Sequence, residues 1–317
     1  MSAESPQQKH PVLKVTRLPP AQEAALYERY QVIDWSPGEP PPAGLEPVRA
    51  VVSSGGVGLP RILAEQLPNL ELVAVNGVGV DAIDFEWTNS RGIRVTTTPG
   101  VLTEDVADIA IALYLSVMRR VVDGDRYVRD GGWEAGRPFP LARSASGRRV
   151  GLLGLGAIGK AIARRVEAFG CEVRYTTRTP VADAPWPHVP ELRELADWAE
   201  VLIVQIPGGK KTAGIVSAEV LAALGPQGVL VNVARGEVVD QPALIEALQR
   251  GVLGAAGLDV FVNEPNVPQA LRELPNVVLQ PHVGSATEET RAAMANIVVN
   301  NVEAFFAGAE DRFVGLV

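Results

Sequence analysis

The chain has 317 residues, of which 47% are hydrophobic, and a net charge of −8. This length allows two domains with sizeable cores, and so acidic a chain lacks the basic face that nucleic-acid binding needs. Its one cysteine, Cys171, excludes a disulfide framework, and neither a secretory signal at the start nor an apolar run of about 18 residues is found, so we expect a cytoplasmic protein without membrane partners.

Short apolar runs alternate with helical segments over the first third of the chain. Helical spacing occurs between the runs, for example in the segment Pro60–Gln66. This alternation is typical of a parallel sheet with helices on both faces. The predicted strands are Val12–Val15, Arg49–Ser54, Leu72–Val75 and Ile93–Thr97.

A long amphipathic helix is predicted over Thr103–Arg120. Thr103 is a candidate N-cap, Glu104 and Asp105 fall in the first turn, and arginines close the last turn. This order of charges suits the helix dipole. We expect this helix to carry the chain from one domain into the next.

A second series of strands and helices follows. A C-terminal helix is predicted over 285–308, where Ser285 and Glu288 have capping-box spacing. Two crossings between domains then predict a discontinuous first domain, 1–98 with 286–317, and a second domain, 99–285. The fold class is therefore α/β with two doubly wound parallel sheets. The strands of the second series are 149–153, 172–176, 201–206, 229–234, 255–260 and 277–280.

A glycine-rich turn, GLLGLGAIGKAIA, joins the first strand and helix of the second series. In a dinucleotide-binding turn of this type, Gly154 makes the tight turn, Gly156 lets the pyrophosphate approach, and Gly159 lets helix and strand pack closely. Two alternatives stay open at this point. The turn can be purely structural, and methyl-donor enzymes share similar turns.

The residues after the next strand indicate which dinucleotide is bound. NAD sites carry an acidic residue about 20 residues past the glycines. Here that place is occupied by Thr177, Arg178 and Thr179. Arginine provides a forked and permanently charged donor for phosphate, which favours NADPH over NADH. The alternative is a solvated loop arginine.

Three polar residues follow strands of the second series and form a candidate catalytic set. His282 is one of three histidines and lies between a strand and a helix, while Arg235 and Glu264 follow other strands. Histidine can donate a proton to a carbonyl, arginine can hold a neighbouring carboxylate, and a carboxylate beside the histidine favours its charged form. The alternatives are a structural ion pair and a histidine that merely starts a helix.

Several ordered motifs in the chain resemble the D-isomer-specific 2-hydroxyacid dehydrogenase family. They are NGVGVDAID, TEDVADIAIAL, the glycine turn, NVARGEVVD, GAAGLDVFVNEP and PHVGSAT. The resemblance implies a Rossmann cofactor domain inserted in a flavodoxin-like substrate domain, and a homodimer built through the cofactor domain. It also implies that Arg235, Glu264 and His282 are catalytic.

The same resemblance implies the binding residues. Substrate would bind Ser54 and Gly55 and the backbone N–H groups of Val78 and Gly79, besides Arg235 and His282. Trp133 is either ordinary core or an aromatic that reaches the partner's substrate cleft. The implied cofactor residues are Gly154, Leu155, Gly156, Ala157, Ile158, Thr177, Arg178, Thr179, Ile206, Pro207, Thr212, Val233, Ala234, Arg235, Asp259, His282 and Gly284.

The resemblance is greatest to NADP-dependent glyoxylate and hydroxypyruvate reductases. It implies a reductase that takes small 2-keto acids to D-2-hydroxy acids with NADPH and without a metal. One alternative is a 2-ketogluconate or hydroxyphenylpyruvate reductase of the same family. The other, from a different class, is a dinucleotide-sensing binding protein like the corepressors that share this fold.

Overall fold

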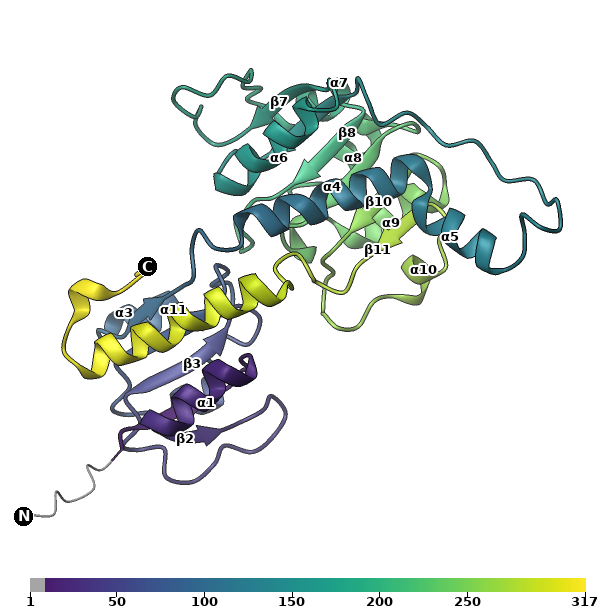
Figure 1. Cartoon of the computed structure of the whole chain (residues 1–317). Helices are drawn as coiled ribbons and strands as arrows, with labels where there is room; N and C mark the ends of the chain where they lie inside the picture. Colours follow the sequence, from purple (N-terminus) through teal and green to yellow (C-terminus); the bar gives the residue numbers. More distant parts are fainter. Residues whose placement is uncertain (1–8) are drawn as a thin grey trace, which may run out of the picture. The chain divides into compact units, whose positions relative to one another are not determined.

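The computed structural model describes residues 9–317, so most of the N-terminal stretch that bears on a secretory signal lies outside the described residues. The chain forms two compact units (Figure 1). The first holds the described residues up to Leu102 together with Ala286–Val317, and the second is Thr103–Ser285. The first crossing therefore falls four residues later than the predicted boundary at 98, because the bend and turn before the long helix stay with the first unit.

The first unit is built on a five-stranded parallel sheet in the order β2-β1-β3-β4-β5, the order of flavodoxin-like folds. Three of its strands match the predictions within two residues at each end, and β1 begins and ends one residue earlier than predicted. Strand β2 was not predicted. The strands are β1 Pro11–Lys14, β2 Gln31–Asp34, β3 Ala50–Ser54, β4 Leu72–Asn76 and β5 Arg94–Thr96.

Helices cover both faces of this sheet because alternate strand residues point to opposite faces. Val51 and Val73 pack on the side of α2 and α3, whereas Val52 and Ala74 pack on the side of α1 and α11. In Figure 1 α11 runs along the sheet beside α1. The helices are α1 Pro20–Arg29, α2 Arg61–Ala64, α3 Phe85–Ser90 and α11 Glu288–Phe306, followed by the 3-10 turn η2 Glu310–Arg312.

The start of α11 corrects one prediction. Its N-cap is Thr287, whose side chain accepts a hydrogen bond from the Thr290 N–H, so Ser285 lies outside the helix. In the sequence alone, the spacing of Ser285 and Glu288 fits a capping box. The turn that carries residues 282–284 ends too late for Ser285 to cap the helix, and the threonine two residues on takes that place.

The second unit is built on a six-stranded parallel sheet in the order β11-β10-β9-β8-β6-β7. The glycine-bearing strand β6 lies between β7 and β8, as in a dinucleotide-binding sheet. Tyr175 of β7 forms an isolated parallel bridge with His188. The strands are β6 Arg149–Leu153, β7 Glu172–Thr176, β8 Val201–Val204, β9 Val229–Asn232, β10 Ala255–Leu258 and β11 Val277–Leu279.

One face of this sheet packs on α7, α8 and α9, and the other packs on α4 and α6. Gly257 of β10 leaves room for α4, since a side chain there would meet Leu113 at 3.0 Å. Burying a leucine such as Leu113 contributes about 1.5–3 kcal/mol. The helices are α4 Thr103–Arg119, α5 Val121–Arg129, α6 Ala157–Glu167, α7 Leu192–Trp198, α8 Ala218–Leu224, α9 Gln241–Gln249 and α10 Gln269–Arg272, with the 3-10 turn η1 Gly236–Val238.

Candidate active site

The six parallel strands of the second unit place most of the predicted residues along one edge. Parallel strands end at the same edge of a sheet, where open α/β folds bind ligands. Each strand in this unit is followed by at least one residue from the predicted set. They are Gly154 after β6, Arg178 after β7, Ile206 after β8, Arg235 after β9, Asp259 after β10 and His282 after β11.

The glycine turn has the shape that a pyrophosphate requires. Gly154 has φ +105°, a conformation that residues with side chains rarely adopt. Gly159 packs close to β6, since a side chain there would lie 2.7 Å from the Gly154 carbonyl oxygen. A side chain at Gly156 would meet nothing within 4 Å, and no side chain caps the start of α6. The N–H groups at this helix start are therefore not capped by a side chain, and a helix start of this kind favours binding of a phosphate.

The turn after β7 holds Arg178 in solvent. Thr177 Oγ1 donates to the Thr179 carbonyl oxygen at 2.7 Å, and His188 Nε2 lies 3.0 Å from the Thr177 carbonyl oxygen. These bonds fix the backbone on both sides of the arginine. Arg178 itself is exposed and forms no ion pair with a carboxylate among residues 9–317. Its guanidinium is thus available for an anionic ligand.

Arg235 lies in a loop that Asn232 shapes. Asn232 is 1% exposed; its Oδ1 accepts from the Ala234 N–H and its Nδ2 donates to the Arg235 carbonyl oxygen, both at 3.0 Å. Gly236 then passes so close to the next loop that a side chain would lie 1.9 Å from the Phe261 carbonyl carbon. The sequence prediction missed both residues. Asn232 carries a recognisable signal, an asparagine two residues before a turn backbone it can bond.

Glu264 and His282 form a hydrogen-bonded pair. His282 Nδ1 lies 2.7 Å from Glu264 Oε2, while Glu264 Oε1 accepts from the Phe261 N–H at 2.9 Å. Burial by itself would raise the pKa of Glu264. The bonds from His282 and Phe261, with the charges of His282 and Arg235, outweigh burial and lower its pKa below the ordinary value. Glu264 is therefore a carboxylate at neutral pH.

Asp259 holds the turn that carries His282. It is 1% exposed, and its carboxylate oxygens accept from the Val283 and Gly284 N–H groups at 2.8 and 2.9 Å. Burial raises the pKa of Asp259, although these two bonds and the charge of His282 oppose that rise. The backbone of His282 is itself left-handed, with φ +54°. Asp259 thus stabilises a strained turn, a role that its predicted place among cofactor residues did not include.

The predicted substrate residues of the first unit also follow adjacent strands. Ser54 ends β3, and Val78 and Gly79 follow β4. The two loops touch, since a side chain at Gly55 would lie 2.8 Å from the Gly79 carbonyl oxygen. Val78 is 42% exposed. The structure therefore brings these four predicted residues into one patch of the first unit.

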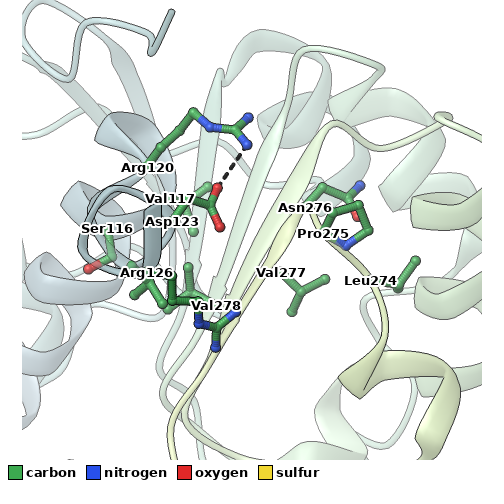
Figure 2. Close-up of a pocket in the computed structure, with 11 residues that line it drawn as sticks. Ser116, Val117, Arg120, Asp123, Arg126, Leu274, Pro275, Asn276, Val277 and Val278 are labelled. Atoms are coloured by element: carbon green, nitrogen blue, oxygen red, sulfur yellow. Dashed lines mark ion pairs between the residues drawn. The ribbon is translucent and has the colours of Figure 1, made fainter. Parts of the chain in front are cut away.

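Trp133 is not core. It follows α5 and is 74% exposed, in a segment that extends from the sheet of the second unit (Figure 1). A small hollow of about 80 Å³ lies near the base of this segment, where the Arg120–Asp123 ion pair faces the start of β11 (Figure 2). This hollow adjoins the amino end of β11, whereas His282 follows the carboxyl end. It is therefore separate from the candidate catalytic residues.

Neither a metal centre nor a membrane span is found within residues 9–317. Histidine, cysteine and acidic side chains in this range form no group of three or more that could hold a metal ion. None of the helices in this range is long and apolar enough to cross a membrane.

Comparison with known proteins gives consistent matches. The family model described as D-isomer specific 2-hydroxyacid dehydrogenase, NAD binding domain, matches residues 111–284. The chain is 50% identical to the glyoxylate/hydroxypyruvate reductase A of Arabidopsis thaliana over 82% of its length and 83% of that protein. It is 48% identical to the hydroxyphenylpyruvate reductase of Plectranthus scutellarioides over 83% and 84% of the two chains.

A solved structure is similar over nearly the whole chain. It is an NADPH-dependent glyoxylate/hydroxypyruvate reductase from Sinorhizobium meliloti, in complex with NADP and malonate. The TM-score is 0.92 at 43% identity, and the match covers 98% of this chain and 97% of that one. The fold of two parallel-sheet α/β domains is thus shared with a nicotinamide-dependent enzyme.

Proposed function

Since the chain belongs to the D-isomer specific 2-hydroxyacid dehydrogenase family, we propose that it is an NADPH-dependent reductase of small 2-keto acids such as glyoxylate and hydroxypyruvate. The observation that carries this proposal is the Glu264–His282 pair, 2.7 Å apart at the sheet edge that also bears the glycine turn. A proton donor and a dinucleotide site on one edge are what reduction of a carbonyl requires.

His282 is the proposed proton donor. Its Nδ1 faces Glu264, so Nε2 is the ring atom that can give a proton to the substrate carbonyl oxygen. Glu264 remains charged, favours the protonated ring and fixes its orientation. When bound at the glycine turn, the dinucleotide supplies the hydride that reaches the carbonyl carbon.

Substrate binding is assigned to charges and backbone donors of this chain. Arg235 would hold the substrate carboxylate through its forked guanidinium and polarise the adjacent carbonyl. In the first unit, the Val78 and Gly79 N–H groups would be donors for an anionic group. Asn232 and Gly236 keep the Arg235 loop close to Phe261, whose N–H donates to Glu264.

The preference for NADPH is assigned to Arg178. An acidic residue at this place would accept bonds from the ribose hydroxyls and repel a 2′-phosphate. The exposed Arg178, which forms no ion pair within residues 9–317, would attract it. A charge-assisted hydrogen bond contributes about 1.5–3 kcal/mol. The Arg178→Ala variant should therefore bind NADPH roughly 10- to 100-fold more weakly, with NADH little changed. Equal weakening of both cofactors would remove Arg178 from this role.

We also propose a cytoplasmic homodimer that uses the surface around α5. Helix α5 has no buried residue of its own, and the segment after it exposes 74% of Trp133 and 97% of Leu141. A dimer would bury these exposed apolar side chains, which is the support for this surface. Light scattering at micromolar concentration should give the dimer mass. A monomer under these conditions would refute the assembly.

A panel of 2-keto acids with NADPH tests the proposal against its alternatives. We expect the highest kcat/KM for glyoxylate or hydroxypyruvate. A higher value for 2-ketogluconate or hydroxyphenylpyruvate would favour those reductases of the same family. Cofactor binding without turnover of any keto acid would favour a dinucleotide-sensing binding protein, the alternative from another class.

A further inference from the structure

Two adjacent lysines, Lys210 and Lys211, lie in the loop after β8 and have no role in the function proposed above. Both are exposed, and neither forms an ion pair with a carboxylate within the described chain. The loop leaves the sheet at the same edge as the turn that carries Arg178. Three unpaired cations therefore follow the two strands that flank β6.

The sheet register places the ends of the two strands that precede these cations at the same level. Leu153 of β6 pairs with Thr176, the last residue of β7, and with Val204, the last residue of β8. The strand ends are level and two strand spacings, about 10 Å, apart. Arg178 comes two residues after one end and Lys210 six residues after the other. Long arginine and lysine side chains can span such a gap from both sides.

The lysine loop is held in place without using the lysines. The Thr212 N–H donates to the Gly209 carbonyl oxygen at 2.9 Å, and Thr212 Oγ1 donates to the Pro207 carbonyl oxygen at 2.8 Å. These bonds close a turn whose central residues are the two lysines. Gln205 Nε2 donates to the Gly154 carbonyl oxygen, which ties the start of the loop to the glycine turn. The turn is thus anchored beside the candidate dinucleotide site, and the charges of Lys210 and Lys211 are not used in these bonds.

We propose that Lys210 and Lys211 form the second cationic wall of the site for the 2′-phosphate of NADPH, facing the wall formed by Arg178. In a dinucleotide-binding sheet the adenosine ribose lies past the glycine turn toward the end of the second strand. A phosphate there carries nearly two negative charges, and the chain as a whole has a net charge of −8. Further cations beside Arg178 would offset that repulsion. This inference rests on the proposed use of NADPH.

The test is the affinity of the full chain for NADPH and NADH, measured by isothermal titration calorimetry. A Lys210→Gln/Lys211→Gln double variant should bind NADPH about tenfold more weakly and NADH within twofold of wild type. The matched control is Lys9→Gln, which removes one lysine charge from the first unit, where Lys9 bonds the Tyr27 carbonyl oxygen. It should leave both affinities unchanged.

A double-mutant cycle with Arg178→Ala sharpens the test. Cations that share one phosphate should show non-additive losses of NADPH affinity. If the wild type prefers NADPH and the lysine double variant keeps the wild-type ratio of NADPH to NADH affinity, this inference is wrong but the proposed cofactor is not. Equal weakening of both cofactors also overturns it, since the lysines would then hold the pyrophosphate. If the wild-type chain binds NADPH and NADH equally well, both the proposed cofactor and this inference are wrong.

Retained NADH binding reports that the variant is folded. A Lys210→Arg/Lys211→Arg variant keeps both charges and should keep the preference for NADPH. If the glutamine variant loses NADH as well and the arginine variant loses the preference, the loop is structural only and the inference is wrong.

Discussion

Replacing Glu264 with glutamine should lower kcat/KM and change the pH profile of keto-acid reduction. The carboxylate accepts two hydrogen bonds, from His282 Nδ1 at 2.7 Å and from the Phe261 N–H at 2.9 Å. An amide has one carbonyl oxygen and no charge, so the charge-assisted bond to the protonated ring is lost. Such bonds contribute about 1.5–3 kcal/mol, equivalent to roughly 10- to 100-fold in kcat/KM.

Solvent reduces this effect, because the side chains of His282 and Glu264 are 47% and 32% exposed. We therefore expect a loss near the lower end, about tenfold in kcat/KM. In wild type the lowered pKa of Glu264 keeps its carboxylate charged until the pH falls below the ordinary glutamate range. Any acid limb of kcat/KM that comes from protonation of this carboxylate should thus be absent from the profile of Glu264→Gln.

The assay is kcat/KM for glyoxylate and NADPH as a function of pH, on wild type, Glu264→Gln and the control Glu237→Gln. Glu237 is exposed in the turn η1, so its variant removes the same charge away from the ring. Its profile should match wild type. An unchanged kcat/KM for Glu264→Gln, or an equal loss in both variants, would refute the role of the Glu264–His282 pair.

Three further predictions follow from the same residues. His282→Ala should lower kcat by at least about 10²-fold, the scale of a lost general acid, with cofactor affinity retained; near-normal turnover in folded protein would contradict it. Arg235→Lys keeps the charge but loses the fork, so steady-state kinetics should show a strongly raised KM for the keto acid and a lower kcat. Because the folded pKa of Glu264 is lowered, its charged form stabilises the fold above the ordinary glutamate pKa of about 4.3, and this contribution is lost as pH falls through the lowered value. Acid unfolding followed by circular dichroism should therefore depend less on pH in Glu264→Gln than in wild type, and identical profiles would contradict this.

Local sequence signals predicted the bounds of a strand correctly where the residues that form the strand also carry the apolar pattern. Strands β6 and β7 have the predicted bounds because buried runs are flanked directly by turn residues. Strand β2 was missed because it lies at the sheet edge and its four residues are only partly buried or exposed. An edge strand lacks the apolar pattern by which a strand is recognised.

The residue types of the candidate site could be predicted from the sequence, but the contacts that hold these residues in place could not. Glu264 and His282 stand after strands, and parallel topology alone brings them to one edge. The tight approach of Gly236 to Phe261 and the bonds of Asp259 to residues 283 and 284 are tertiary contacts. No spacing in the sequence encodes them, because they depend on how two loops from different strands pack.

NADPH-dependent reduction of 2-keto acids is tested most directly by the turnover of glyoxylate by the wild-type chain with NADPH and with NADH, under otherwise identical conditions. We expect steady oxidation of NADPH, with kcat/KM at least about tenfold higher than for NADH, as one charge-assisted phosphate contact implies. Equal use of NADH, or no oxidation of either cofactor by any 2-keto acid, would contradict this proposal.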